Sequence, residues 1–159
     1  MLFKNVLVPY DESEHAKSAL HIALGMVGDD PTATVHVLAI VATGAFTSPT
    51  LTGNAFDDLS YLSDPDRTEN DDIMGALVHR ARTDMQGTVD DALDGATCKV
   101  VITAGVASSP VEGIAEYVES HGIDLVVMGR RGLGALRGML GSVSFGVLRS
   151  VDVPVLTVK

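Results

Sequence analysis

Short apolar runs alternate along the chain with longer segments of helical periodicity, and this alternation is the feature that most constrains the fold. Between the runs, apolar residues recur three and four positions apart, as they do on one face of a helix. The runs themselves have the length and the aliphatic composition of strands: Asn5–Pro9, 34–41, 99–103, 124–128 and the run from Val153 to Val158. Strands alternating with helices form parallel sheets with right-handed crossovers. The sequence therefore predicts an α/β fold, with a doubly wound parallel sheet and four helices.

Capping residues predict where the helices begin. Asp11 and Ser13 offer caps to the first helix, and Glu14 stands three residues after Asp11, as in a capping box. Ser109, followed by a proline and then by Glu112, has the pattern that begins a helix. The second helix is expected from about position 71, and two glycines weaken its pattern.

Composition narrows the class of protein. A chain of 159 residues suits one domain, 1–159, and 46% hydrophobic residues are too many for a disordered chain. The net charge of −10 provides no basic surface for nucleic acid, and no apolar stretch approaches the ~20 residues that span a membrane. Cys98 is the single cysteine, so no internal disulfide can form, and the N-terminal residues lack a secretory signal pattern. We expect a cytoplasmic protein without nucleic-acid binding or membrane insertion.

A long polar stretch, 43–70, separates the second strand from the second helix. It is rich in Asp, Ser and Thr and contains two prolines, which favours a surface excursion without regular structure. Neither flanking part has enough strands to fold by itself. The stretch is therefore interpreted as a mobile loop of one domain and not as a linker between two.

Glycines cluster directly after the fourth strand. Glycine lets a backbone approach a ligand closely, and five glycines fall within thirteen positions: 129, 132, 134, 138 and 141. Ser142 is predicted to cap the helix that follows, and the N–H groups and partial positive charge of a helix start attract anions. Hydroxyls of Ser142 and Ser144 add donors, and Arg130, Arg131 and Arg137 add positive charge. Glycine-rich segments are often plain turns, but the helix start and the arginines favour a cradle for phosphate.

Three common glycine motifs do not fit this segment. A P-loop requires a Gly-Lys pair, which the chain lacks. A dinucleotide fingerprint built on Gly132 and Gly134 needs glycine where Arg137 stands, and it normally follows the first strand. A hydrolase elbow around Ser144 needs glycine where Ser142 stands. The predicted cradle is therefore of another type.

The segment resembles the signature of the ATP-binding universal stress proteins: Gly, two residues, Gly, nine residues, Gly, then Ser or Thr. Gly129, Gly132, Gly141 and Ser142 match, although eight residues and not nine separate Gly132 from Gly141. The first strand with its Asp turn (6–13), the fourth strand and the last strand also resemble this family, so the resemblance covers nearly the whole chain. It implies an open, Rossmann-like nucleotide-binding sheet in the order 3-2-1-4-5.

The resemblance also implies an ATP site in a crevice where the first and fourth strands end. The adenosine would contact strand ends and the turn after the first strand: Pro9, Tyr10, Asp11, Ile40, Met128 and Gly129. The phosphates would be held by N–H groups, hydroxyls and positive charge of the loop and the next helix: Arg130, Arg131, Gly132, Gly141, Ser142, Val143 and Ser144. Mg²⁺ or Mn²⁺ would bridge the phosphates. Asp11 serves equally well as a helix cap, and Ile40 as a core residue.

Three functions fit these features. The first is a nucleotide-dependent regulator in the stress response, whose occupancy by an adenine nucleotide is read by an unidentified protein partner. The second is a slow ATPase, which ranks lower because no nucleophile–base pair is evident. The third is a nucleotide-free structural dimer, which the shortened glycine loop would allow. The five histidines show no metal-ligand spacing and are interpreted as surface or packing residues.

The last strand predicts assembly. It is apolar, and Pro154 is typical of an edge strand, whose unpaired backbone groups can bind another chain. The resemblance implies pairing across a two-fold axis. We expect a homodimer through the strand from Val153 to Val158.

Overall fold

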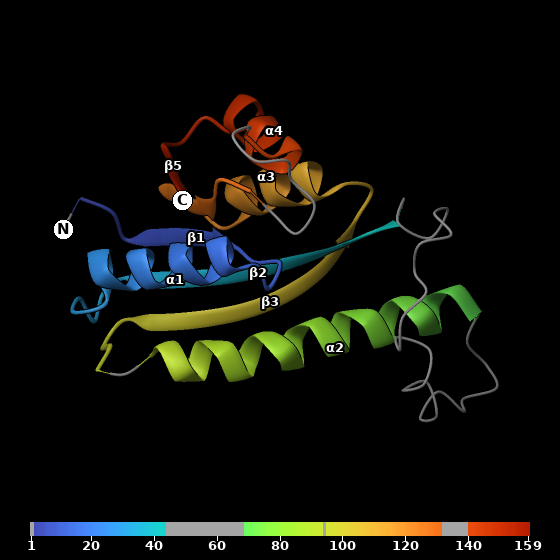
Figure 1. Ribbon diagram of the computed structural model, residues 1–159, viewed down its shortest axis with the longest axis horizontal. Helices are drawn as coiled ribbons and strands as arrows, with labels where there is room; N and C mark the ends of the chain where they lie inside the picture. The colour runs from blue at the N-terminus through green and yellow to red at the C-terminus, as the bar shows by residue number, and fades with distance from the viewer. Residues whose placement is uncertain (1, 44–68, 94, 132–139) are drawn as a thin grey trace.

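Among the residues that the computed structural model describes, 2–43, 69–93, 95–131 and 140–159, five parallel strands form one sheet. Their order is β3-β2-β1-β4-β5 (Figure 1), which confirms the prediction. The strands are β1 (Asn5–Pro9), β2 (Thr34–Ala42), β3 (Lys99–Ala107), β4 (Leu125–Gly129) and β5 (Val155–Val158). β5 forms one edge of the sheet, as Pro154 indicated, and β3 forms the other.

Two strand bounds differ from the prediction by two residues or more, and the others agree to within one residue. β3 does not end at Thr103 but continues to Ala107, because its pairing with β2 extends to the partners Ala42 and Ala107. Ala and Gly are weak strand formers, and here the neighbouring strand outweighs their local preference. β5 begins at Val155 and not at Val153, directly after Pro154, which has no N–H to donate.

Helices flank both faces of the sheet, as predicted. In the described residues they are α1 (Glu14–Val27), α2 (Glu69–Ala92), α3 (Pro110–Ser120) and α4 (Ser142–Ser150). α1 and α2 cover one face, and α3 and α4 cover the other (Figure 1). Residues 69 and 70, the end of the predicted loop 43–70, belong to α2, and 44–68 lie outside the described residues. None of the helices in the described ranges is long and apolar enough to cross a membrane.

Two aliphatic clusters hold these layers together. Val6 and Val8 of β1 face α1 and α2, whereas Leu7 faces α3 and α4, and all three side chains are fully buried. Burial on both faces explains why the strand sequences are apolar throughout instead of alternating. Each such side chain contributes about 1.5–3 kcal/mol by leaving water. Cys98 packs partly buried beside the first cluster, where burial raises the pKa of its thiol.

The neighbouring strands β1 and β4 lead to opposite faces of the sheet. β1 pairs with β4, and the chain passes from β1 into α1 on one face and from β4 into α4 on the other. A crevice forms where two such connections diverge at the carboxyl ends of parallel strands. In the described residues, the fold therefore places the predicted site near the carboxyl ends of β1 and β4.

Candidate functional site

The turn of residues 10–13, here called the Asp11 turn, follows β1 and would form one wall of the predicted crevice. The Asp11 side chain accepts two hydrogen bonds at Oδ1, from the Ser13 N–H (3.1 Å) and the Ser13 hydroxyl (2.6 Å). Ser13 Oγ in turn accepts a bond from Ala16 N–H (3.2 Å), so Ser13 is the cap of α1. The predicted capping box of Asp11 and Glu14 is wrong, because the helix starts two residues later than that box requires. Asp11 instead fixes the capping serine.

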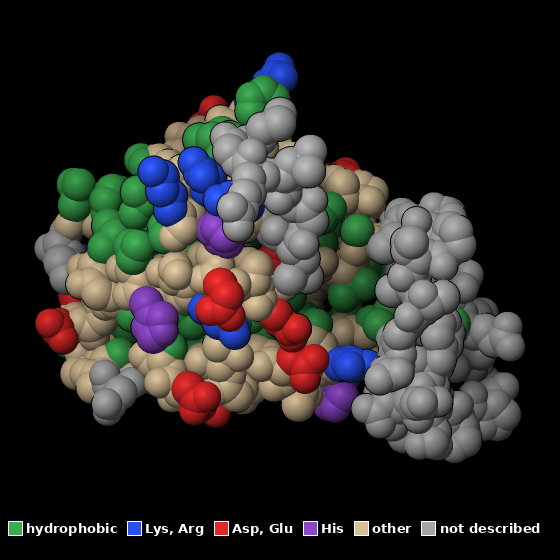
Figure 2. All heavy atoms as spheres, in the orientation of Figure 1, with side chains coloured by type: hydrophobic (Ala, Val, Ile, Leu, Met, Phe, Trp, Pro, Cys, Tyr) green, Lys and Arg blue, Asp and Glu red, His purple; other side chains and the backbone are tan. Residues whose placement is uncertain are grey.

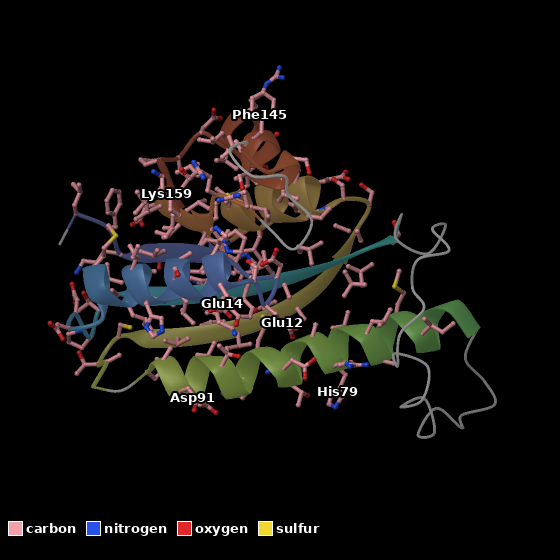
Figure 3. The ribbon with its side chains drawn as sticks, in the orientation of Figure 1. Glu12, Glu14, His79, Asp91, Phe145 and Lys159 are labelled. Carbon is pink, nitrogen blue, oxygen red and sulfur yellow. The ribbon has the colours of Figure 1, made fainter. Side chains whose placement is uncertain are left out.

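The Asp11 turn is strongly acidic. Glu12 has a φ of 64°, a conformation that residues other than glycine adopt at a cost of the order of 1 kcal/mol. Glu14 follows in the first helical turn, and Figure 3 shows both side chains near the start of α1. Carboxylates are favourable there because they complement the positive end of the helix. The start of α1 is thus occupied by the chain's own oxygens.

Gly129 joins the other wall of the crevice to α1. A Cβ at this position would lie 2.7 Å from His15 Cβ and 3.0 Å from the His15 carbonyl carbon. Only glycine lets the end of β4 approach the first turn of α1 this closely. No pattern in the sequence predicts this role of His15, since the contact depends on how the helix packs on the sheet.

Hydrogen bonds attach the start of α4 to the end of β4. Arg130 N–H donates to Val158 O of β5 (2.6 Å), and Arg130 O accepts from Gly141 N–H (2.9 Å). The Ser144 hydroxyl lies 2.9 Å from Gly129 O and 3.2 Å from Arg130 O. Residues 141–144, here called the α4 start, are therefore held directly beside the last residue of β4. The predicted site residue Gly132 and the nearby Arg137 lie outside the described residues.

The α4 start has no side-chain cap. Its N-cap is Gly141, with φ −64° and ψ 153°, and Ser142 is the first helical residue. The prediction that Ser142 caps this helix is wrong by one position, because the first backbone bond of the helix runs from Phe145 N–H to Gly141 O (2.9 Å). The N–H groups of Ser142, Val143 and Ser144 have no acceptor within the helix. They form the donor set that an anion needs.

The backbone of two arginines, Arg130 and Arg131, lies beside the α4 start. Nε of Arg130 and Nε of Arg131 are buried, and neither has a hydrogen-bond partner among the described residues. A buried polar group without a partner is uncommon, and an acceptor at this place would satisfy it. In Figure 2, Lys and Arg side chains gather in the upper part of this face, while Asp and Glu side chains lie below them, around the start of α1. The described residues contain no group of three His, Cys, Asp or Glu side chains that could hold a metal by themselves.

Three predicted base-side residues share one face of the sheet. Ile40 and Met128 pack in the α3/α4 cluster, and Pro9, two positions beyond Leu7 of the same cluster, points to that face as well. They come from three adjacent strands, β2, β1 and β4. Ile40 is also a packing residue: its Cδ1 lies 2.8 Å from where a Cβ of Gly113 would be. The Tyr10 side chain lies in the cluster on the opposite face, and its N–H donates to Leu38 O (2.8 Å).

A histidine cluster lies beneath α3, away from these residues. His36 of β2 is buried, and its Nδ1 lies 3.1 Å from the Tyr117 hydroxyl. The ring of His121 stacks on the ring of Tyr117, with 3.7 Å between the ring centroids. Burial, and then the neighbouring His121 and Lys99, lower the pKa of His36. His36 is a packing residue and His121 lies on the surface, as the interpretation of the histidines as surface or packing residues allowed, but the sequence did not predict that they meet.

Comparisons with known proteins identify the family to which this fold belongs. The pattern that defines the Universal stress protein family matches residues 2–159. Universal stress protein MJ0577 of Methanocaldococcus jannaschii is 30% identical over 166 aligned positions, which cover 100% of this chain and 96% of that protein. Its solved structure has the same fold, with a TM-score of 0.76 at 23% identity over 100% of this chain and 97% of that chain.

Two further solved structures of the same fold contain nucleotides. A universal stress protein in complex with cAMP has a TM-score of 0.61 at 21% identity, covering 99% of this chain and 98% of its own. The universal stress protein from Archaeoglobus fulgidus in complex with dAMP has a TM-score of 0.60 at 18% identity, covering 100% of both chains. From the match along its whole length, the chain belongs to the universal stress protein family.

Proposed function

We propose that this protein binds ATP, or a related adenine nucleotide, between the Asp11 turn and the α4 start, and acts as a nucleotide-dependent regulator in the stress response. The observation that carries the proposal is the α4 start, a helix N-terminus without a side-chain cap beside two arginines with unpartnered Nε atoms. Backbone donors and guanidinium groups are the usual partners of phosphate. The relatives in complex with cAMP and dAMP support adenine as the base.

The described residues suggest how the parts of the nucleotide would be held. The adenine would lie on the α3/α4 face of the sheet near Pro9, Ile40 and Met128. The ribose would lie near Asp11, whose Oδ1 is engaged by Ser13 and whose Oδ2 remains to accept from sugar hydroxyls. The phosphates would receive the N–H groups of residues 142–144. Gly132 would complete the phosphate contacts in the part of the loop outside the described residues.

A divalent cation would be held mainly by the nucleotide. The described residues provide no three-carboxylate or histidine cluster, so phosphate oxygens and water would have to supply most ligands, an arrangement that Mg²⁺ and Mn²⁺ tolerate. The cation would neutralise charge between phosphates. Adding EDTA should then weaken ATP binding and leave AMP binding nearly unchanged.

Binding is better supported than turnover. In the described part of the crevice, the Ser144 hydroxyl lies on backbone carbonyls, which cannot activate it. The Ser13 hydroxyl does donate to Asp11, but its oxygen accepts from Ala16 N–H as the cap of α1 and is engaged in that role. A slow ATPase remains the second candidate, and phosphate release under single-turnover conditions distinguishes it from a regulator.

Calorimetric titration of nucleotide-stripped protein in the presence of Mg²⁺ tests the proposal. We expect saturable heat with ATP and an increase in melting temperature, since a ligand that binds only the folded state stabilises it. Identification of small molecules released by denaturing freshly purified protein should show an adenine nucleotide. Absence of both signals with ATP, ADP and AMP would favour the third candidate, the nucleotide-free structural dimer.

We further propose that the protein is a cytoplasmic homodimer that pairs through β5 and presents its nucleotide state to a protein partner. β5 is an edge strand, Leu156 is 38% exposed on it, and Phe145 and Leu148 are exposed on the neighbouring α4. Two such edges would bury each other's backbone groups across a two-fold axis. Light scattering should give twice the chain mass, and Leu156→Asp should shift it toward the single-chain mass.

A further inference from the structure

The hydroxyl of Ser144 is engaged in hydrogen bonds inside the protein. Its side chain is 3% exposed, although it lies in the first turn of α4, and its oxygen lies 2.9 Å from Gly129 O and 3.2 Å from Arg130 O. A serine hydroxyl has one proton to donate, and these two carbonyl oxygens share it. Phosphate oxygens at neutral pH are acceptors, so a hydroxyl whose proton is engaged has nothing to donate to them.

Two further contacts fix the same helical turn. Arg130 O accepts from Gly141 N–H as well as from Ser144, so two donors of the α4 start converge on one carbonyl. One helical turn on, a Cβ at Gly146 would lie 2.6 Å from Val111 Cγ2, so α4 lies tightly against α3. Helix α4 is therefore held at its start by hydrogen bonds and along its length by packing.

Ser142 presents the opposite situation in the same turn. Its side chain is exposed, and no hydrogen bond of its hydroxyl is found within the described residues. Ser142 and Ser144 thus form a natural pair: one hydroxyl is available to a ligand, and the other is used inside the protein.

We infer that Ser144 is a positioning residue, whose hydroxyl fixes the α4 start against the end of β4 and whose contribution to the nucleotide is made through its backbone N–H. The inference rests on the proposed function, because it concerns how the phosphate-binding groups are kept in place. Without this hydroxyl, the carbonyls of Gly129 and Arg130 lose a donor and the α4 start can move away from the base side of the crevice. A ligand would then have to order this turn again when it binds.

Amide hydrogen exchange in the ligand-free full chain, combined with ATP titration, tests the inference. In Ser144→Ala, we expect the protection of the Gly141 N–H to fall about tenfold and ATP affinity to fall about tenfold, the range for one lost hydrogen bond. Ser142→Ala should weaken ATP binding and leave Gly141 protection unchanged. Ser150→Ala, at the exposed far end of α4, should change neither.

An isosteric pair keeps the test valid if Ser144→Ala does not fold. Ser144→Thr retains the hydroxyl and Ser144→Val replaces it with a methyl group of the same shape. The threonine variant should keep wild-type protection and affinity, and the valine variant should lose both. Circular dichroism and thermal melting verify that each variant is folded.

Three outcomes would overturn the inference. Loss of ATP affinity without loss of Gly141 protection would mean that the hydroxyl contacts the nucleotide itself. Loss of protection without loss of affinity would mean that the link does not position the site, and no change in either would mean that the link is unimportant. A wild-type protein that bound no nucleotide would instead overturn the proposed function, and the positioning role with it.

Discussion

At the start of α1 side chains take up backbone N–H groups, and at the start of α4 none in the described residues does. Ser13 accepts from Ala16 N–H, Asp11 accepts from Ser13, and Glu14 adds negative charge. Gly141 offers no side chain to α4, no acidic residue lies in the first turn of that helix, and Arg130 and Arg131 precede it. Each helix is the next element after one of two neighbouring strands, α1 after β1 and α4 after β4.

The difference shows how one fold can contain both a capped helix start and one whose N–H groups are left to a ligand. A side-chain cap stabilises a helix by about 0.5–2 kcal/mol, but it occupies the donors that an anion would use. A glycine cap gives up part of that stabilisation and leaves the donors available. The acidic turn beside α1 also directs an anion toward α4, because like charges repel it. Replacing one type of start by the other is therefore the sharpest way to test the comparison.

The largest effect is expected from Gly141→Asp, which gives α4 the kind of cap that α1 has. The backbone at this position is extended, as a capping aspartate requires. Its carboxylate would accept from the N–H groups that the phosphates need and would repel them. We expect ATP affinity to fall by on the order of 100-fold while the melting temperature stays the same or rises.

Gly141→Ala is the matched control, because it adds a Cβ without a carboxylate. That Cβ would lie 3.4 Å from Arg130 O, close to ordinary contact. The alanine variant should retain most of the affinity in the same titration. If Gly141→Asp bound ATP as the wild type does, the α4 start could not be the phosphate site.

Gly129→Ala tests whether the two helix starts depend on the close packing of Gly129, the last residue of β4, against the first turn of α1. The added Cβ would overlap with His15, including its backbone carbonyl carbon, which cannot move aside easily. We therefore expect a loss of about 1–3 kcal/mol in the free energy of unfolding. Urea denaturation measures this loss. Gly25→Ala is the control: no atom lies within 4 Å of its Cβ, and removing a glycine from the exposed last turn of α1 should stabilise the protein by up to about 0.5–1 kcal/mol. Equal stability of the two variants would contradict the packing at Gly129.

Ser13→Ala removes the cap of α1 and should affect stability more than binding. We expect a loss of about 1 kcal/mol in the free energy of unfolding, the usual value for a lost N-cap. ATP affinity should change much less than in Gly141→Asp, because the α1 start is not expected to contact phosphate. Ser18→Ala, which removes an exposed hydroxyl bonded to Glu14 O on the same helix, should have almost no effect in the same measurements. An affinity loss as large as that of Gly141→Asp would remove the distinction between the two starts.

Acidification should have the smallest effect and should act away from both helix starts. The folded protein lowers the pKa of His36, which is faced by Tyr117 and His121 from α3 and by Lys99 from β3. Below about pH 6.5, His36 therefore binds a proton more readily in the unfolded chain than in the folded protein. The free energy of unfolding has its full value above that pH and declines as the pH falls below it. Denaturation midpoints at pH 7.5 and 5.5 should differ less in His36→Gln than in the wild type. His21→Gln, at an exposed position on α1, should behave as the wild type does; an identical response of His36→Gln would contradict the assignment.

The fold could be predicted from the sequence because its signals are local. The apolar runs, the capped start at Ser109 and the prolines each act within a few residues, and the structure confirms the elements that they indicate. The length of β3 could not be predicted, because Ala104 and Gly105 become a strand only by pairing with β2.

The site was less accessible to prediction than the fold. The glycine segment indicated where an anion would bind, but a serine directly after a glycine does not reveal which of the two is the cap. The roles of Gly129 against His15 and of the Ser144 hydroxyl depend on contacts between elements distant in the chain. The effect of the shortened spacing between Gly132 and Gly141 stays a prediction, because most of that loop lies outside the described residues.

The bond from Arg130 N–H to Val158 O has a consequence for communication between sites. One peptide unit, which contains the Arg130 N–H, separates the α4 start from the edge strand through which two chains would pair. The next peptide unit contains Arg130 O, which accepts a hydrogen bond from Gly141 N–H. If nucleotide binding displaces that peptide, the strength of pairing changes, and thermodynamic reciprocity requires pairing to change nucleotide affinity by the same factor. Occupancy would then depend on protein concentration as well as on nucleotide concentration, so the protein would report its own abundance together with that of its ligand.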